Sequence, residues 1–224
     1  MSAAVTRYFM SSIGRKQLIA LTGLLLCGFL VTHLLGNVLL LVGADAFNLY
    51  AHKLMSMGAL IYVAEAGLAA IFLAHLGLAM KMTWENKVAR GQKYYAKNRT
   101  GRGETIMSAT MPYTGLIILV FLVLHILQFK FGAYYETTVD GVVMRDLYRT
   151  VVEFFRSPLN TAWYVFAMAA AAVHTSHGFA SAFQSFGFNH GAWTPCVKKA
   201  SYAYALVVGG GFALISILLH VKGA

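Results

Sequence analysis

Apolar residues gather into five long runs separated by shorter polar segments. We predict a helix for each run, at about residues 17–43, 57–81, 111–131, 159–183 and 201–221. Each run reaches about the 20 residues that a helix needs to cross about 30 Å of hydrocarbon. Five such runs are too many for the core of a soluble protein of this size. The pattern therefore predicts an all-α integral membrane bundle of five transmembrane helices, with residues 1–224 as a single domain.

Composition and charge add an orientation to this picture. Hydrophobic residues make up 58% of the 224 residues, and the formal net charge is +10. Twelve of the 18 Lys and Arg residues lie in the N-terminal segment and in the loops 81–110 and 184–200, which share one side of a five-helix bundle. Because basic loops stay in the cytoplasm, we expect a cytoplasmic N-terminus and an external C-terminus. Nucleic acid is the other partner that such charge suggests, but no soluble basic domain is apparent to bind it.

The connections on the outer side carry weaker signals. We expect Ala44–Ser56 to be a short loop. In Val142–Phe155, apolar residues recur among charged ones, which predicts a helix lying along the membrane interface. The first two runs and the next two look like two similar hairpins, because each hairpin has one histidine in its outgoing helix and one in its returning helix.

These histidines are His33, His75, His125 and His174. The helical rise places His33 and His125 about 21–24 Å from the cytoplasmic edge, and His75 and His174 about 9–13 Å from it. Neutral imidazole is a common axial ligand of haem iron, and polar groups in lipid are costly and usually functional. The sequence therefore predicts two bis-histidine haems, with His33 and His125 in an outer layer and the other two in an inner layer.

The inner layer leaves an alternative open. His177 lies three residues after His174 and is a rival ligand. His174 is at the centre of a face of small residues, formed by Ala167, Ala170, Ala171, Gly178 and Ser181. This face would make room for a porphyrin, or it would simply allow tight helix packing. Its position favours His174 over His177 as the ligand.

Two runs of sequence resemble a known family. They are Ser11–Asn37 (SSIGRKQLIALTGLLLCGFLVTHLLGN) and His174–His190 (HTSHGFASAFQSFGFNH). Both resemble the cytochrome b subunit of succinate:quinone oxidoreductases, in its single-subunit, five-helix, di-haem form (the cytochrome b558 family). The resemblance implies two b haems, with His33 and His125 as distal ligands and His75 and His174 as proximal ligands. In that family the first histidine of the run corresponding to His174–His190 is the ligand.

The same resemblance implies partners and a location. The chain would be the anchor of a succinate dehydrogenase or fumarate reductase in the bacterial cytoplasmic membrane. A flavoprotein, which carries the dicarboxylate chemistry, and an iron–sulfur subunit would dock on the cytoplasmic face. Electrons would pass between the iron–sulfur subunit, the two haems and a quinone, usually menaquinone. Candidates for contact with the propionates of the proximal haem or with the iron–sulfur subunit are Arg15, Lys16 and Gln17. Alternatively, they only belong to the basic segment that sets the membrane topology.

A quinone site is expected near the outer haem. In some menaquinol-oxidising relatives a glutamate near the outer end of the second helix assists quinol deprotonation, and the matching region around Asn48 has none. Glu65 is the one charged residue of the apolar run Met57–Met80 and lies near the depth of the outer haem. It is the candidate for handling protons, the alternative being a hydrogen bond to a neighbouring helix. Asn48 and His52 are further candidates for contacting the quinone.

Two other function classes fit parts of the sequence. One is a proton-coupled transporter with a histidine relay, but the paired interrupted helices of transporters are matched here by Gly209–Gly211 alone. The other is an anchor that has lost its haem. All four ligand positions of the resemblance are filled, which favours a haem protein over such an anchor.

Overall fold

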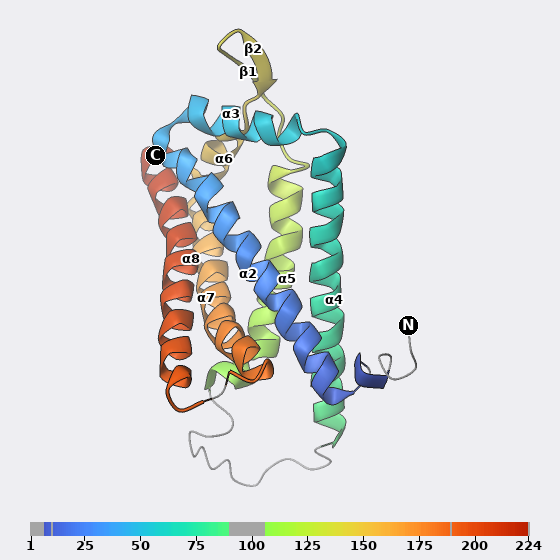
Figure 1. The fold of residues 1–224 in the computed structure, drawn as a ribbon. Coiled ribbons are helices and arrows are strands. Elements are labelled where there is room, and N and C mark those ends of the chain that lie inside the picture. Colours follow the sequence, from blue (N-terminus) through green and yellow to red (C-terminus); the bar gives the residue numbers. More distant parts are fainter. Residues whose placement is uncertain (1–6, 10, 90–105, 189, 224) are drawn as a thin grey trace.

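The computed structural model of the chain describes residues 7–9, 11–89, 106–188 and 190–223, and helices dominate it (Figure 1). The long helices are α2 (Ser12–Val42), α4 (Ala59–Ala89), α5 (Ile106–Phe129), α7 (Pro158–Ser185) and α8 (Trp193–Gly223). The elements that connect them are α3 (Ala44–Met55), strands β1 (Glu136–Val139) and β2 (Val142–Arg145), and α6 (Leu147–Phe155).

Four helices of the described chain are long and apolar enough to cross a membrane: α2, α4, α8 and the Ser108–Phe129 part of α5. The 31 residues of α2 rise about 46 Å, which exceeds the hydrocarbon thickness of about 30 Å. The 28-residue helix α7 is not among the four, because polar side chains such as Asn160, His174 and Ser176 dilute its apolar ones. The chain is therefore a multi-pass membrane protein made mainly of helices.

The helices extend further than the apolar runs that predicted them. α4 ends at Ala89 rather than at 81, and α8 begins at Trp193 rather than at 201. Backbone hydrogen bonding continues beyond the hydrocarbon into polar sequence, so apolar length underestimates helix length. α2 begins at Ser12 rather than at 17, because the Ser11 side chain caps it by accepting a hydrogen bond from the Gly14 N–H at 3.1 Å. The remaining helix ends differ from the predicted ones by a few residues.

Two connections on one side of the bundle differ from the prediction. Residues 44–56 are not a loop, because all but the last of them form α3. Val142–Phe155 is not one helix but strand β2 followed by α6, so a short β-hairpin accompanies the helices of an all-α bundle. The reason is the Asp140-Gly141 turn, in which both residues have positive φ (51° and 78°), as a two-residue hairpin turn requires. The apolar periodicity of this stretch belongs to α6 alone.

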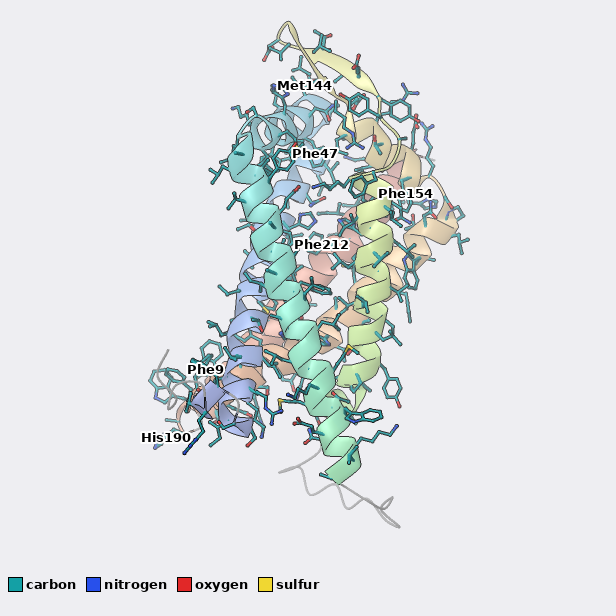
Figure 2. All side chains as sticks on the ribbon, turned by 90° about the vertical axis from the view of Figure 1, so that its right-hand side faces the viewer. Phe9, Phe47, Met144, Phe154, His190 and Phe212 are labelled. Carbon is teal, nitrogen blue, oxygen red and sulfur yellow. The ribbon has the colours of Figure 1, made fainter. Side chains whose placement is uncertain are left out.

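α7 occupies the centre of the bundle and α4 its edge. α7 packs along α8, α5 and α2, whereas α4 packs against α2 (Figure 1). The connecting elements α3, β1, β2 and α6 gather at one end, called here the α3 end. α2 begins and α4 ends at the opposite end, called here the Arg15 end. Figure 2 shows Phe47, Met144 and Phe154 at the α3 end, and Phe9 and His190 at the Arg15 end.

The hydrophobic core lies toward the α3 end. Its buried side chains come from α2, α3, α6, α7 and α8, and they are Leu34, Leu40, Phe47, Val151, Phe155, Tyr164, Val208, Ile215 and Leu219. Leu40 and Leu219 are almost completely enclosed, at 1% and 0% exposure. In α4, all of whose residues are described, none is buried. Helix α4 therefore depends much less than α7 on packing against other protein side chains.

Candidate functional site

The structure brings two of the four predicted histidines into direct contact. The rings of His33 in α2 and His125 in α5 lie with their centroids 5.8 Å apart and their planes at 90°. Phe29 stacks on the His33 ring, and Phe212 of α8 lies 5.5 Å from it. Figure 2 shows Phe212 between α4 and α5 in projection. This contact joins the outgoing helices of the two hairpins.

The hydrogen bonds of His125 indicate which of its nitrogens carries the proton. The hydroxyl of Tyr164 lies 3.3 Å from Nδ1 of His125 and donates its only proton to Oε1 of Gln128 at 2.6 Å. Its oxygen is thus left to accept a proton from Nδ1, which leaves the lone pair of Nε2 free. Such an orienting bond on the far nitrogen is typical of histidines that bind metals.

His33 is held less firmly than His125. Its Nε2 lies 3.5 Å from the amide nitrogen of Asn37, which donates a shorter bond of 2.8 Å to the His33 carbonyl. A contact of 3.5 Å lies at the limit of a hydrogen bond. A metal could therefore replace it at Nε2 at little cost.

His75 of α4 lies against the neighbouring helix α2. Its Nδ1 is 3.2 Å from the carbonyl oxygen of Ile19 and 3.0 Å from Oγ1 of Thr22. A carbonyl can only accept, so Nδ1 carries the proton and Nε2 keeps its lone pair. A Cβ added to Gly23 would stand 3.1 Å from Cε1 of His75. Thr22 and Gly23 thus form a close-fitting seat for the imidazole ring.

His174 of α7 has the same kind of seat on α5. Its Nδ1 lies 3.1 Å from Oγ1 of Thr114, and it makes a backbone hydrogen bond to Met111. A Cβ added to Gly115 would stand 3.5 Å from Cε1 of His174. Each returning helix therefore seats its histidine on a Thr-Gly pair of its own outgoing helix.

The two histidine levels are separated by the same interval on both outgoing helices. Gly23, beside His75, precedes His33 by ten residues, and Gly115, beside His174, precedes His125 by ten residues. Ten helical residues rise about 15 Å. This interval is at the upper end of the separation expected from sequence.

The spacing of the outer histidine pair would allow both imidazoles to bind one metal ion. The described residues contain no group of three or more His, Cys, Asp or Glu side chains placed to hold a metal. Two metal–imidazole bonds of about 2 Å on opposite sides of one ion would put the ring centroids about 6 Å apart. The His33–His125 separation of 5.8 Å fits this value, and a porphyrin would supply the remaining ligands to the iron.

Of the predicted cytoplasmic contacts, Arg15 and Gln17 already have protein partners. The guanidinium of Arg15 forms an ion pair with both carboxylate oxygens of Glu85, at 2.6 and 2.7 Å, and so ties the start of α2 to the end of α4. Gln17 donates to the Ser185 carbonyl at 3.4 Å and accepts from Tyr8. Lys16 is exposed. Contacts of these residues with haem propionates or an iron–sulfur subunit stay predictions.

The predicted quinone contacts lie at the α3 end without forming one cluster. Glu65 pairs with Lys130, just past the end of α5, and both side chains are about two-fifths exposed, at 39% and 43%. Asn48 is buried at 1% exposure. Its amide donates to Oδ1 of Asp146 at 2.9 Å and accepts from the Tyr148 N–H at 2.9 Å. His52 is partly buried on α3.

The small residues around His174 differ in burial. Ala167 and Ala170 are buried, at 0% and 8% exposure, and Ala171, Gly178 and Ser181 are partly buried. The close contact with α8 is made elsewhere on α7, because a Cβ added to Gly209 would stand 2.7 Å from that of Ala172 and 3.1 Å from the Met168 carbonyl oxygen. Both interpretations of the small face, room for a porphyrin and helix packing, stay predictions. His177, the rival ligand, is half-buried.

Sequence reasoning missed the Thr-Gly seats and one pocket. The signal for the seats was present, because Thr22–His33 (TGLLLCGFLVTH) and Thr114–His125 (TGLIILVFLVLH) share Thr-Gly-Leu, Phe-Leu-Val and the final His in register. The pocket, about 490 Å³, lies at the Arg15 end of α7 and α8. It is lined by Phe179, Phe183, Phe188, Trp193, Cys196, Val197 and Ala200. These residues come from the end of α7, the start of α8 and their connection. No sequence motif predicted that they would line a pocket.

Comparisons of the chain with protein-family models, with curated proteins and with solved structures found no match. The function is therefore inferred from the residues and contacts described above.

Proposed function

We propose that the chain is the membrane anchor and electron-transfer subunit of a succinate:quinone oxidoreductase, and that it holds two b haems. One observation carries the proposal: four histidines on four helices form two levels, and at three of them hydrogen bonds place the proton on Nδ1 and leave Nε2 available. His33 and His125 would hold the distal haem, and His75 and His174 the proximal haem. A bound haem supplies reversible one-electron chemistry at its iron.

The protein's own part in this function is to position and to insulate. Hydrogen bonds from Nδ1 orient three of the rings, and Phe29, Phe121 and Phe212 pack around the outer pair. A spacing of about 15 Å between the levels would keep the two haems within electron-transfer range. α4 buries no residue against the described protein, so a large planar group beside His75 would add to the contacts that hold this helix.

The proposal includes an orientation and partners. α7 would be a fifth span, placing the Arg15 end in the cytoplasm and the α3 end outside the bacterial cytoplasmic membrane. A flavoprotein and an iron–sulfur subunit would dock on the Arg15 end, where basic residues such as Lys16, Lys198 and Lys199 are exposed. A quinone, with menaquinone as the first candidate, would exchange electrons near the distal haem, where Glu65, Asn48 and His52 are the contacts to test.

A reduced-minus-oxidised spectrum of the purified full-length protein tests the proposal directly. We expect a b-type α-band and two haems per chain by the pyridine haemochrome assay. The intact complex should couple succinate oxidation or fumarate reduction to a quinone. Absence of haem from protein made with ample haem supply would overturn the proposal and would leave a transporter or a haem-free anchor.

A further inference from the structure

The two outgoing helices carry one repeated motif, Thr-Gly with a His ten residues after the Gly, at Thr22–His33 and Thr114–His125. The histidine at the end of each copy belongs to the outer level. The Thr-Gly pair at its beginning contacts the other level, because Thr22 and Gly23 face His75 while Thr114 and Gly115 face His174. Each copy thus serves both histidine levels.

The two threonines are bonded alike. Oγ1 of Thr22 donates within its own helix, to the Leu18 carbonyl at 2.8 Å or the Ile19 carbonyl at 3.1 Å. Oγ1 of Thr114 does the same toward Thr110 and Met111, at 3.1 and 3.2 Å. Because a hydroxyl has a single proton, each oxygen is left to accept from the histidine Nδ1–H. Both rings are therefore held in the same tautomer.

Both glycines lie beside a histidine ring, and the contact is tight at Gly23, whereas a Cβ added to Gly115 would make an ordinary van der Waals contact with His174 at 3.5 Å. A methyl group at position 23 would stand 3.1 Å from Cε1 of His75, a distance at which the ring must move. Gly28 lies on the same helix, and a Cβ there would meet nothing within 4 Å. A methyl group at position 23 would thus displace the His75 ring, whereas one at position 28 would meet nothing within 4 Å.

We propose that Thr22–Gly23 and Thr114–Gly115 are two equivalent positioning pairs, which orient His75 and His174 toward one shared porphyrin iron. This inference rests on the proposed function. It adds that residues of α2 and α5, which donate ligands only to the outer haem, control the inner haem. An acceptor on Nδ1–H makes the imidazole a stronger donor to iron and so favours the ferric state.

The test uses the full-length protein in its complex, with optical redox titration of each haem. Thr22→Val and Thr114→Val keep the side-chain shape and remove the hydroxyl acceptor, while the backbone bonds to Ile19 and Met111 remain. We expect each to raise the midpoint potential of the same haem, the one lost in His75→Ala, and to leave the other haem unchanged. Thr22→Ser should restore the wild-type potential. Thr32→Val is the matched control, because the Thr32 hydroxyl donates to the Phe29 carbonyl on an exposed surface of α2.

Gly23→Ala gives an independent measurement. It should shift the low-spin ferric EPR signal of the inner haem, or weaken retention of that haem 10–100-fold, the range typical of changes to residues behind a metal ligand. Gly28→Ala should do neither. The inference is overturned if both threonine variants leave both potentials unchanged, or if they affect different haems, in protein that still holds two haems. Wild-type protein without haem would instead overturn the proposed function itself.

Discussion

Helices α4 and α7 hold equivalent positions in the two hairpins and are packed very differently. Each returns after a connecting helix and seats a histidine on a Thr-Gly pair. α7 is enclosed by α8, α5 and α2, with Ala167 at 0% exposure, whereas α4 packs against α2 and none of its residues, all of them described, is buried. The comparison teaches that contacts with three helices hold α7 in place, whereas α4 is held mainly by α2.

The largest expected effect comes from removing either inner histidine. His75→Ala and His174→Ala should each lower the haem content from two to one per chain, because a bis-histidine iron loses half of its axial ligation. The double variant should also retain one haem, since both residues serve the same one. His190→Ala, an exposed position at the Arg15 end, is the control. Retention of two haems in either single variant, or loss of both in the double variant, would break the pairing across α4 and α7.

The next effect tests how tightly α7 is packed. Gly209→Ala would place a methyl group 2.7 Å from Cβ of Ala172 and 3.1 Å from the Met168 carbonyl oxygen. Overpacking of this kind costs about 1–3 kcal/mol, so the thermal midpoint in detergent should fall. Gly210→Ala is the matched control, because its new Cβ would stand 3.8 Å from Leu206 and would gain about 0.5–1 kcal/mol of helix propensity. Equal midpoints for the two variants would contradict close packing of α7 on α8.

A similar loss is expected where the two hairpins are joined at the α3 end. Asn48→Ala removes a donor to Asp146 and an acceptor for the Tyr148 N–H at a site with 1% exposure. Leaving buried polar groups unpaired costs about 1–3 kcal/mol. Chemical denaturation in detergent measures this loss, with exposed Lys53→Ala on the same helix as control. A change below the error of the Lys53→Ala value would show that Asn48 does not join α3 to α6.

The sequence predicted the membrane bundle well, because apolar runs report burial in lipid directly. The same signal could not give the helix ends, since hydrogen bonding in α4 continues through Lys81 to Ala89, where charged residues interrupt the apolar run. It also missed the β-hairpin, whose Asp140-Gly141 turn was outweighed by apolar spacing in the residues that follow. The sequence could not predict three partners of the candidate residues, because each pair is separated by 65 or more positions. These partners are Glu85, Lys130 and Asp146.

The histidine level was predictable and the seats were harder to find. Depth along a helix follows from counting residues, which is why the contact between His33 and His125 agrees with their matched depths. The choice of Thr22 and Gly23 depends on how α2 and α4 face each other, which residue counting does not determine. The small face of α7 was ambiguous for the same reason, and the close contact of α7 with Gly209 is made by Met168 and Ala172, outside that face.

The smallest stability effect is expected from the ion pair between α4 and the end of α5. The same pair also tests what Glu65 of α4 does. Glu65→Gln and Lys130→Gln each break the pair, whose side chains are 39% and 43% exposed. Such exposed pairs contribute about 0–1 kcal/mol, so both variants should keep their thermal midpoints and both haem spectra. If Glu65 handles protons for the quinone, Glu65→Gln should slow quinol turnover while Lys130→Gln, which keeps the carboxylate, should not. If the pair is only a clamp that holds α4 to α5, the two variants should behave alike, because either loss opens the same contact. Steady-state quinol oxidation measured on both variants, at equal haem content, separates these outcomes.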